Sequence, residues 1–187
     1  MTPIAILGGL WVVFIVVWFI SALFAKRTLH QSLAPWLFRI IVSIALLVLL
    51  SWRGGPAPAV VALWQPWASA GVQYLGVVLA ALGIALAIWA RLYLGRNWGM
   101  PQSVKENPEL ITTGPYHYIR HPIYSGMLLA FIGSILTSGL GWIIVFVVGG
   151  SYFIWSSKNE ERLMEKTFPE TYPAYKARTY ALIPFIY

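Results

Sequence analysis

Side chains capable of chemistry are concentrated in one short stretch, Gly114 to Gly126, with the sequence GPYHYIRHPIYSG. It contains two of the chain's three histidines, three tyrosines, an arginine and two prolines. Each proline fixes φ and lacks a backbone donor, so the stretch is predicted to be a shaped loop. Because the residue before a proline avoids helical geometry, Pro122 is predicted to be the first residue of a helix. A rigid loop rich in hydrogen-bonding groups beside a helix indicates a ligand-binding site.

The inventory of metal-binding side chains is short. The chain has six glutamates but no aspartate and no cysteine. Without cysteine, disulfides and thiolate metal sites are excluded, and the lack of aspartate removes most metal-carboxylate schemes. No metal site is therefore predicted. Glu106 and Glu109 precede the loop, and the other four glutamates follow Asn159.

Composition places this chain in a membrane. Hydrophobic residues make up 59% of the 187 residues, charged residues only 10%, and the mean hydropathy is +0.71. A soluble domain carries about a quarter charged residues, so an integral membrane protein is predicted. The net charge of +7 would also suit a nucleic-acid partner. In a membrane protein, the positive charge is better explained by the rule that lysines and arginines gather on the cytoplasmic side. No nucleic-acid partner is therefore expected.

Three apolar stretches in the first half are each long enough to cross a hydrocarbon core of ~30 Å as a helix. The third is rich in small residues that allow neighbouring helices to pack closely, among them Gly71, Gly76, Ala80, Gly83 and Ala87. The predicted spans are Ile4–Phe24, Pro35–Trp52 and Ala68–Leu94.

The apolar stretch from Pro122 to Ser157 is too long for one ordinary span and too short for two full ones. Gly139 and Gly141, within the sequence TSGLG, supply a turn near its middle. Two short helices, Pro122–Leu136 and Trp142–Trp155, are therefore predicted to form a hairpin.

Five crossings also agree with the distribution of positive charge. They place twelve of the thirteen lysines and arginines on one side of the membrane and leave only Arg53 on the other. Since positively charged loops stay in the cytoplasm, the N-terminus is predicted outside an inner, plasma or endomembrane and the C-terminus inside. The Gly114–Gly126 loop, the C-terminal tail and all six glutamates then share the cytoplasmic side.

The tail is predicted to be amphipathic. Leu163, Phe168, Tyr172 and Tyr175 suggest a helix that lies on the membrane face and is interrupted near Pro169 and Pro173. The chain is thus predicted to be one all-α domain of five transmembrane helices with an added cytoplasmic amphipathic helix. Residues 1–95 would form a three-helix part, and residues 96–187 would form the part that carries the site.

The second half of the chain, from Pro101 onward, resembles a known family. The pattern Arg-His-Pro-x-Tyr-x-Gly followed by a glutamate pair is similar to isoprenylcysteine carboxyl methyltransferases and, in the same region, to phospholipid methyltransferases. The residues that carry the resemblance are Leu110, Thr113 to Tyr116, Arg120 to Gly126, Glu160, Glu161, Phe168, Tyr172, Tyr175 and Pro184.

The resemblance implies an enzyme that binds S-adenosylmethionine on the cytoplasmic side and methylates a lipophilic or lipid-modified acceptor among the membrane lipids. It leaves the oligomeric state open. It also implies which residues contact the methyl donor. These are Gln102, Pro108, Glu109, Leu110, Ile111, Tyr116, His121, Pro122, Ile123, Tyr124 and Glu160, with Arg120 and Glu161 as candidate catalytic residues.

The chemistry of these side chains suits such a donor. Methyl transfer from a sulfonium is an in-line displacement, so the protein must mainly hold donor and acceptor in register and exclude water. Glu160 can accept both ribose hydroxyls or pair with the amino group, and the faces of Tyr116 or Tyr124 can attract the sulfonium. This chemistry requires no metal or redox cofactor.

One position departs from the prenylcysteine methyltransferases. Those enzymes have an arginine one turn before the first glutamate, suited to a substrate carboxylate, whereas this chain has Ser156. Arg120 and Arg162 are the candidate replacements. A carboxylate, an amine, a thiol and a phospholipid head group all remain open as the methyl acceptor.

Simpler roles are open for several of these residues. His121 can cap the following helix, and Glu160 and Glu161 can be the solvated start of a helix, where negative charge is favoured. Arg120 can anchor a lipid phosphate, and the tail tyrosines can pack at the interface. Two alternatives also remain for the whole protein: a nicotinamide-dependent protein like the sterol reductases, whose C-terminal architecture is similar, and a non-catalytic membrane scaffold.

Overall fold

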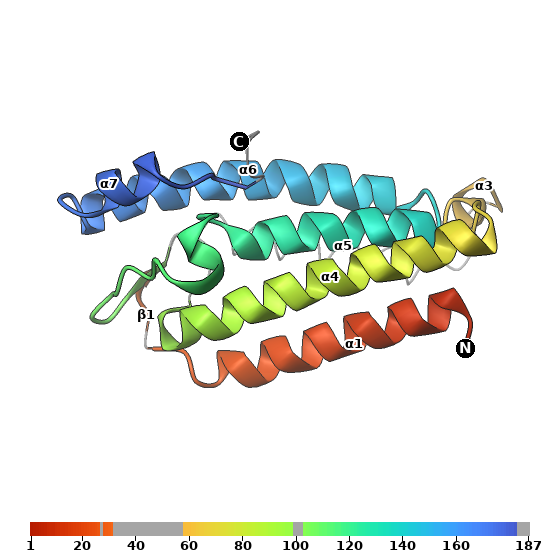
Figure 1. Cartoon of the computed structure of the whole chain (residues 1–187), viewed down its shortest axis with the longest axis horizontal. Helices are drawn as coiled ribbons and strands as arrows, with labels where there is room; N and C mark the ends of the chain where they lie inside the picture. Colours follow the sequence, from red (N-terminus) through yellow and green to blue (C-terminus); the bar gives the residue numbers. More distant parts are fainter. Residues whose placement is uncertain (27, 32–57, 99–102, 183–187) are drawn as a thin grey trace.

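The computed structural model describes residues 1–26, 28–31, 58–98 and 103–182. Its main body consists of four long helices that lie side by side, α1, α4, α5 and α6 (Figure 1). From the N-terminus the elements are α1 (Pro3–Ala22), β1 (Thr28–Gln31), α3 (Pro58–Ala62), α4 (Ala70–Leu94), a 3-10 turn (Gly95–Asn97), β2 (Ser103–Lys105), a second 3-10 turn (Gly114–His117), α5 (Pro122–Ser138), α6 (Trp142–Thr167) and α7 (Tyr172–Ala177).

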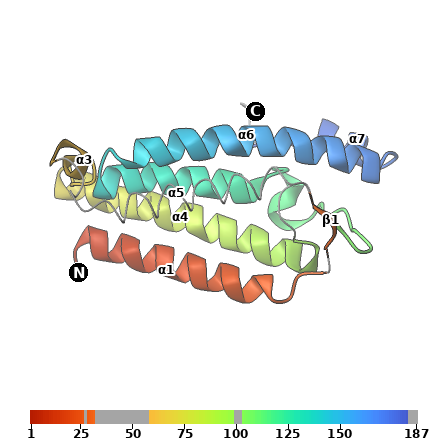
Figure 2. The ribbon, with the colours of Figure 1, turned by 180° about the vertical axis from the view of Figure 1, so that it is seen from behind.

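The order of the helices in space brings the second half of the chain together. Helix α4 packs between α1 and α5, and α6 packs on α5 (Figure 2). Strands β1 and β2 form one short antiparallel pair, with Thr28 opposite Lys105 and Gln31 opposite Ser103. The helical architecture predicted from the sequence is thus confirmed, with this strand pair added to it.

Small residues set the contact between α4 and α5, as predicted. A Cβ atom at Gly83 would overlap backbone atoms of Gly126 and Ala130, and one at Gly133 would overlap those of Gly76 and Ala80. The two backbones therefore approach as closely as glycine permits. Gly71, in the first turn of α4, has no neighbour within 4 Å of such an atom and takes no part in this contact.

Aromatic rings fill the space between α1, α5 and α6. Tyr124 of α5 stacks on Phe153 of α6 with ring centroids 4.6 Å apart, and Phe153 lies parallel to Phe131 at 6.3 Å. Phe131 in turn stacks on Trp11 of α1 at 5.9 Å, and Trp11 on Trp142 at 5.5 Å. These five rings form a continuous column, which we call the aromatic column, along the interior of the bundle.

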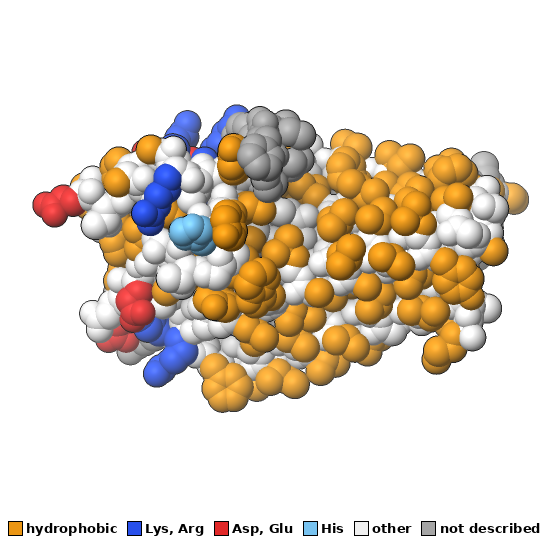
Figure 3. Space-filling view, in the orientation of Figure 1, with side chains coloured by type: hydrophobic (Ala, Val, Ile, Leu, Met, Phe, Trp, Pro, Cys, Tyr) orange, Lys and Arg blue, Asp and Glu red, His pale blue; other side chains and the backbone are white. Residues whose placement is uncertain are grey.

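The surface separates apolar sides from one charged end. Pro3–Ala22 and Ala70–Asn97 are long and apolar enough to cross a membrane, and Pro122–Ser138 is a shorter apolar helix. Hydrophobic side chains cover the helices in Figure 3, while charged side chains gather at the end where α7 lies. This is the distribution that a bilayer imposes. The predicted second span, Pro35–Trp52, lies outside the described residues, so five crossings stay a prediction.

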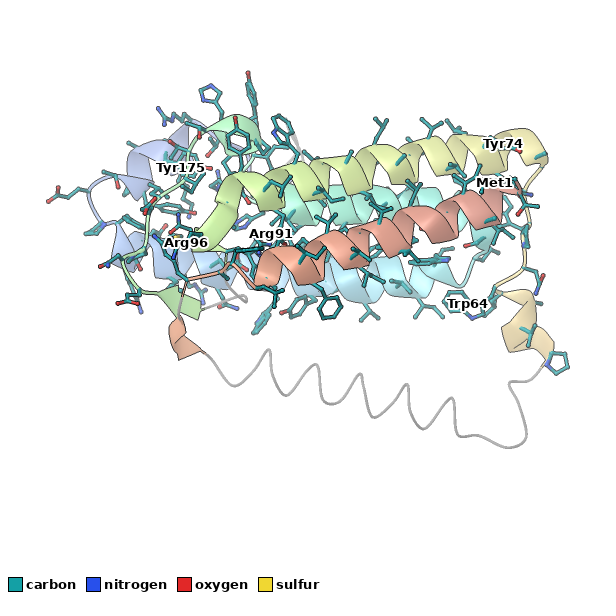
Figure 4. All side chains as sticks on the ribbon, turned by 90° about the horizontal axis from the view of Figure 1, so that it is seen from below. Met1, Trp64, Tyr74, Arg91, Arg96 and Tyr175 are labelled. Atoms are coloured by element: carbon teal, nitrogen blue, oxygen red, sulfur yellow. The ribbon has the colours of Figure 1, made fainter. Side chains whose placement is uncertain are left out.

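The two ends of the bundle are also distinct in Figure 4. Met1, Trp64 and Tyr74 lie at one end, and Arg91, Arg96 and Tyr175 lie at the other. Helices α1 and α4 both run toward this second end, while α5 starts there and runs back (Figure 1). The start of α5 and the ends of α1, α4 and α6 therefore meet at the charged end.

Helix α6 corrects the predicted end at Trp155. It continues without a break to Thr167, because the polar stretch that follows the apolar part consists mainly of strong helix formers and its first proline is Pro169. The predicted hairpin with α5 is present, and it turns at Gly139, whose φ is 148°. Glu160 therefore lies inside a helix and does not mark the start of one.

Candidate functional site

The loop at the start of α5 has the predicted form. A 3-10 turn covers Gly114–His117, and α5 begins at Pro122 after a non-helical His121 with φ of −124° and ψ of 58°. Gly114 has a φ of 59° and packs against the ring of Tyr93, where a Cβ would overlap the ring. Local sequence thus fixes both the shape of this loop and the position of His121 directly before the helix.

The tail after α7 lies along this loop and pairs with it. The backbone N–H of Arg120 donates to Tyr180 O at 2.8 Å, and that of His121 donates to Ala181 O at 3.0 Å. Tyr180 N–H donates to Tyr118 O at 3.0 Å. The Ser125 hydroxyl donates to the carbonyl of Leu182. The tail, which follows α6 and α7 in sequence, therefore holds the loop in place.

Glu160 faces this loop from α6. Its Oε2 lies 3.5 Å from His121 Nδ1. Its Oε1 accepts hydrogen bonds from the hydroxyl of Tyr124 and, at 3.0 Å, from that of Ser156. Ser156 is fully buried, and the His121 and Tyr124 rings are stacked with centroids 5.6 Å apart. One carboxylate is thereby fixed beside two stacked rings.

Glu161 is held by positive charge. Arg120 Nε donates to its Oε1 at 2.7 Å, and Lys176 Nζ lies 2.9 Å from its Oε2. Burial opposes ionisation, but contacts with His121, Lys176 and Arg120 hold the pKa of Glu161 far below its ordinary value. The second nitrogen of Arg120, Nη1, donates to the carbonyls of Lys176 and Thr179. Arg120 is thus bound within the protein on two sides.

His121 lies between the two carboxylates. Its Nε2 is 3.6 Å from Glu161 Oε1, too long for a hydrogen bond, and has no hydrogen-bond partner within the described residues. Burial disfavours the charged ring, but the carboxylates of Glu160 and Glu161 outweigh it, so the pKa of His121 is raised. The ring therefore lies between two carboxylates, and its Nε2 remains without a hydrogen-bond partner in the described part of the chain.

Tyrosines from the turn and the tail close the site. Tyr175 donates its hydroxyl to Tyr116 O at 2.7 Å, and both side chains are buried. Burial, and then the charge of Glu160, raises the pKa of Tyr116 far above its ordinary value. Burial likewise raises the pKa of Tyr175 to about 12. Both phenols are therefore neutral, and Tyr175 packs inside the site, not at the membrane surface where sequence reasoning put it.

Sequence reasoning assigned no role to Ser125, Thr179 or Lys176, which the structure joins to the site. Tyr172, Tyr175 and Thr179 follow a spacing of three and four residues, which is typical of one helix face. That spacing is the sequence signal from which the shared contacts of Tyr172, Tyr175 and Thr179 could have been predicted. The backbone pairing of residues 180–182 has no such signal, because carbonyl acceptors carry no side-chain signature.

The remaining predicted donor contacts stay predictions, and the structure shows the surroundings of most of them. Glu109 pairs with Lys26 Nζ at 2.8 Å and accepts from Asn97 Nδ2 at 3.3 Å. The Lys26 hydrogen bond holds the pKa of Glu109 below its ordinary value. In the described structure no hydrogen bond or ion pair joins Glu109 to Glu160. Pro108 is exposed, Leu110, Ile111 and Ile123 are half-buried, Pro122 is buried, and Gln102 lies outside the described residues.

The structure is a helical bundle in which the loop that carries His121 faces Glu160 at the charged end. The family model described as phospholipid methyltransferase matches residues 72–171, more than half of the chain. The chain belongs to this family.

Similar proteins include two named for metal resistance and several named as methyltransferases. The chain is 27% identical over 154 residues to a nickel-cobalt-cadmium resistance protein, NccN, of Alcaligenes xylosoxydans xylosoxydans, which covers 79% of this chain and 63% of NccN. It is 28% identical over 119 residues to a probable protein-S-isoprenylcysteine O-methyltransferase of Oryza sativa subsp. indica, covering 62% of each.

A solved structure supports the same relationship. The eukaryotic intramembrane Ras methyltransferase, isoprenylcysteine carboxyl methyltransferase, matches with a TM-score of 0.55 and 26% identity over 63% of this chain and 46% of that one. The chain thus spans less than two thirds of the length of each of these three proteins.

Proposed function

We propose that this protein is an S-adenosylmethionine-dependent methyltransferase that acts on a lipophilic acceptor in the membrane. One observation carries the proposal: His121 and Tyr124, at the start of α5, meet Glu160 of α6 at the charged end of the bundle. Membership of the phospholipid methyltransferase family supports it, as does the similarity to protein-S-isoprenylcysteine O-methyltransferases.

The residues at this site fit S-adenosylmethionine. The donor carries a ribose diol, an amino-acid end, an adenine and a cationic sulfur that supplies the methyl group when bound. The Glu160 carboxylate suits the hydroxyls or the ammonium, and the face of Tyr124 suits the sulfonium. The unpaired Nε2 of His121 is a buried polar atom that lacks a partner within the described protein. The loop at residues 108–111 is our candidate for the adenine edge.

The remaining residues of the site position these groups. Arg120, Lys176 and Glu161 join α6 to α7 and the loop, so they fix His121 relative to Glu160. We propose that they act by positioning and by excluding water, which is what an in-line displacement requires of the protein. Burial of Tyr116 and Tyr175 supports this exclusion of water.

The acceptor is proposed to arrive from the bilayer along α5 and α6. The aromatic column begins beside Glu160 at Tyr124 and leads into the apolar part of the bundle. Apolar rings of this kind suit a hydrocarbon chain. The reacting group of the acceptor is a carboxylate, an amine, a thiol or a phospholipid head group. We further propose five crossings, with the N-terminus outside and the site in the cytoplasm.

Titration of the purified protein with S-adenosylmethionine and, separately, with NADPH tests the proposal. We expect S-adenosylmethionine to bind and Glu160→Gln to weaken that binding at least tenfold, about the size of one charge-assisted hydrogen bond. The matched control is Glu170→Gln, which alters an exposed carboxylate and leaves the affinity unchanged. Binding of NADPH instead supports a reductase-like protein, and binding of neither supports a scaffold.

Radiolabelled donor identifies the acceptor. Membranes that contain the protein are incubated with methyl-labelled S-adenosylmethionine, and the labelled lipids and small molecules are separated. We expect label in a lipid-soluble fraction that depends on Glu160. Label confined to water-soluble molecules would contradict a membrane acceptor.

A further inference from the structure

Arg91 is a buried cation that the proposed function has not used. It lies in the last turn of α4, at the charged end of the bundle, and is only 1% exposed (Figure 4). Its Nη1 donates to Gly95 O at 2.9 Å and its Nη2 to Ser21 O at 2.6 Å. Its guanidinium lies 4.4 Å from the ring centroid of Trp98. Its Nε has no hydrogen-bond partner within the described residues.

No carboxylate side chain of the chain neutralises Arg91. The six glutamates are its only acidic side chains, and all of them lie in the described residues. None forms an ion pair with Arg91; the recorded ion pairs use Lys26, Arg120, His121 and Lys176. The helix-end carbonyls and the Trp98 ring offset part of the charge. A buried cation without an anion remains costly, which favours binding of an anion from outside the chain.

Tyr116 links this cation to the candidate site. The 3-10 turn that carries Tyr116 packs on α4. The Tyr116 phenol is influenced by the negative charge of Glu160 and by the positive charge of Arg91. Gly114, the first residue of this turn, lies against the ring of Tyr93, two residues after Arg91, so the turn sits beside the end of α4 that carries the cation. This arrangement matches a ligand whose end carries both a carboxylate and an ammonium group.

We propose that Arg91 binds the carboxylate at the amino-acid end of S-adenosylmethionine through Nε, beside the turn that carries Tyr116. This inference rests on the proposed function and assigns a further residue to the same site. Arg91 is only 1% exposed and the turn at Gly114–His117 packs on α4, so binding of the carboxylate requires a shift of the covering residues. The same guanidinium chemistry also suits a lipid phosphate, and the experiment separates these two sources.

The test compares S-adenosylmethionine with its decarboxylated analogue, which keeps the sulfonium, the nucleoside and the amine but lacks the carboxylate. Dissociation constants for both are measured on wild-type protein, on Arg91→Met and on the control Arg96→Met, which alters an exposed arginine of the same end. We expect wild-type protein and the control to prefer the carboxylate-bearing donor by about 10- to 100-fold. In Arg91→Met the preference should fall to about onefold, mainly through weaker binding of S-adenosylmethionine.

The following results would overturn the inference that Arg91 binds the carboxylate. Equal affinity of wild-type protein for the two donors rejects it even if Arg91→Met fails to fold. A variant that weakens both donors equally shows that Arg91 only caps the helix ends or binds a lipid phosphate. Failure of wild-type protein to bind either donor rejects the proposed function itself, whereas equal binding of both rejects only the role of Arg91.

Discussion

His121 Nδ1 lies 3.5 Å from Glu160 Oε2, so the residue before α5 faces a residue well inside α6. The contact joins the loop that contains Pro115 to the polar C-terminal part of α6, a helix whose first half is apolar. The neighbouring Glu161 forms ion pairs with Arg120 and Lys176. These contacts connect the start of α5 with α6 and α7. Their contribution to stability can therefore be measured separately from activity.

Glu161→Gln should destabilise the protein. The amide keeps the size of the side chain but leaves Arg120, which is 10% exposed, without its carboxylate. Removal of one partner from a buried ion pair costs about 3–5 kcal/mol, so we expect a loss near the lower end of that range. Thermal unfolding of the purified protein in detergent measures the change.

The control for this variant is Glu165→Gln. Glu165 also pairs with Lys176, but both side chains are well exposed. An exposed ion pair contributes about 0–1 kcal/mol, so this variant should unfold almost as the wild-type protein does. Equal losses in the two variants would show that the burial of Glu161 contributes nothing.

Stability should depend on pH through His121 and Glu161 in opposite directions. The lowered pKa of Glu161 gives a contribution that is present above pH 4.5 and is lost as the pH falls through the folded-state value. The raised pKa of His121 gives a contribution that is complete below pH 6.5 and is lost as the pH rises through the folded-state value.

His121→Asn isolates the second effect. The difference in melting temperature between wild-type protein and this variant should be largest below pH 6.5 and should shrink at alkaline pH. His117→Asn, which alters an exposed histidine of the same loop, serves as the control. A difference that does not change with pH would mean that His121 contributes by packing alone.

Gly83→Ala should separate α4 from α5. The new Cβ meets backbone atoms of Gly126 and Ala130, which cannot move aside as a side chain can. Overpacking of this kind costs about 1–3 kcal/mol. Gly71→Ala, in the same helix but with no neighbour within 4 Å, should be neutral or stabilising by up to about 1 kcal/mol. Unfolding midpoints that change alike in both variants would contradict close packing at Gly83.

Arg120→Lys should loosen the tail although it keeps the charge. An ammonium group cannot reproduce the guanidinium contacts with Glu161 and with the carbonyls of Lys176 and Thr179 together. We expect faster hydrogen exchange at the amides of residues 120 and 121, whose acceptors lie in the tail. Arg178→Lys, at an exposed position of the tail, should leave exchange there unchanged, and equal exchange in both variants would refute the role of Arg120.

The sequence predicted the parts of this site that depend on local rules. Proline geometry placed the start of α5 at Pro122, and charge asymmetry put the loop and Glu160 at one end of the bundle. Two features escaped prediction because they depend on the fold. Helix α6 continues past Trp155 because the polar residues that follow are mainly strong helix formers, although they are not apolar. The ion pair of Glu109 with Lys26 joins residues distant in sequence, so no local pattern indicates it.

The pairing of residues 118–121 with 180–182 makes assembly of the site a late event in synthesis. A ribosome must complete α6 and α7 before the carbonyls that order Arg120 and His121 exist. Until then the loop has its prolines but lacks its long-range acceptors. Nascent chains that stall between α6 and residue 182 are thus expected to insert their helices without ordering Arg120 and His121, so ligand binding should require synthesis of residues 180–182.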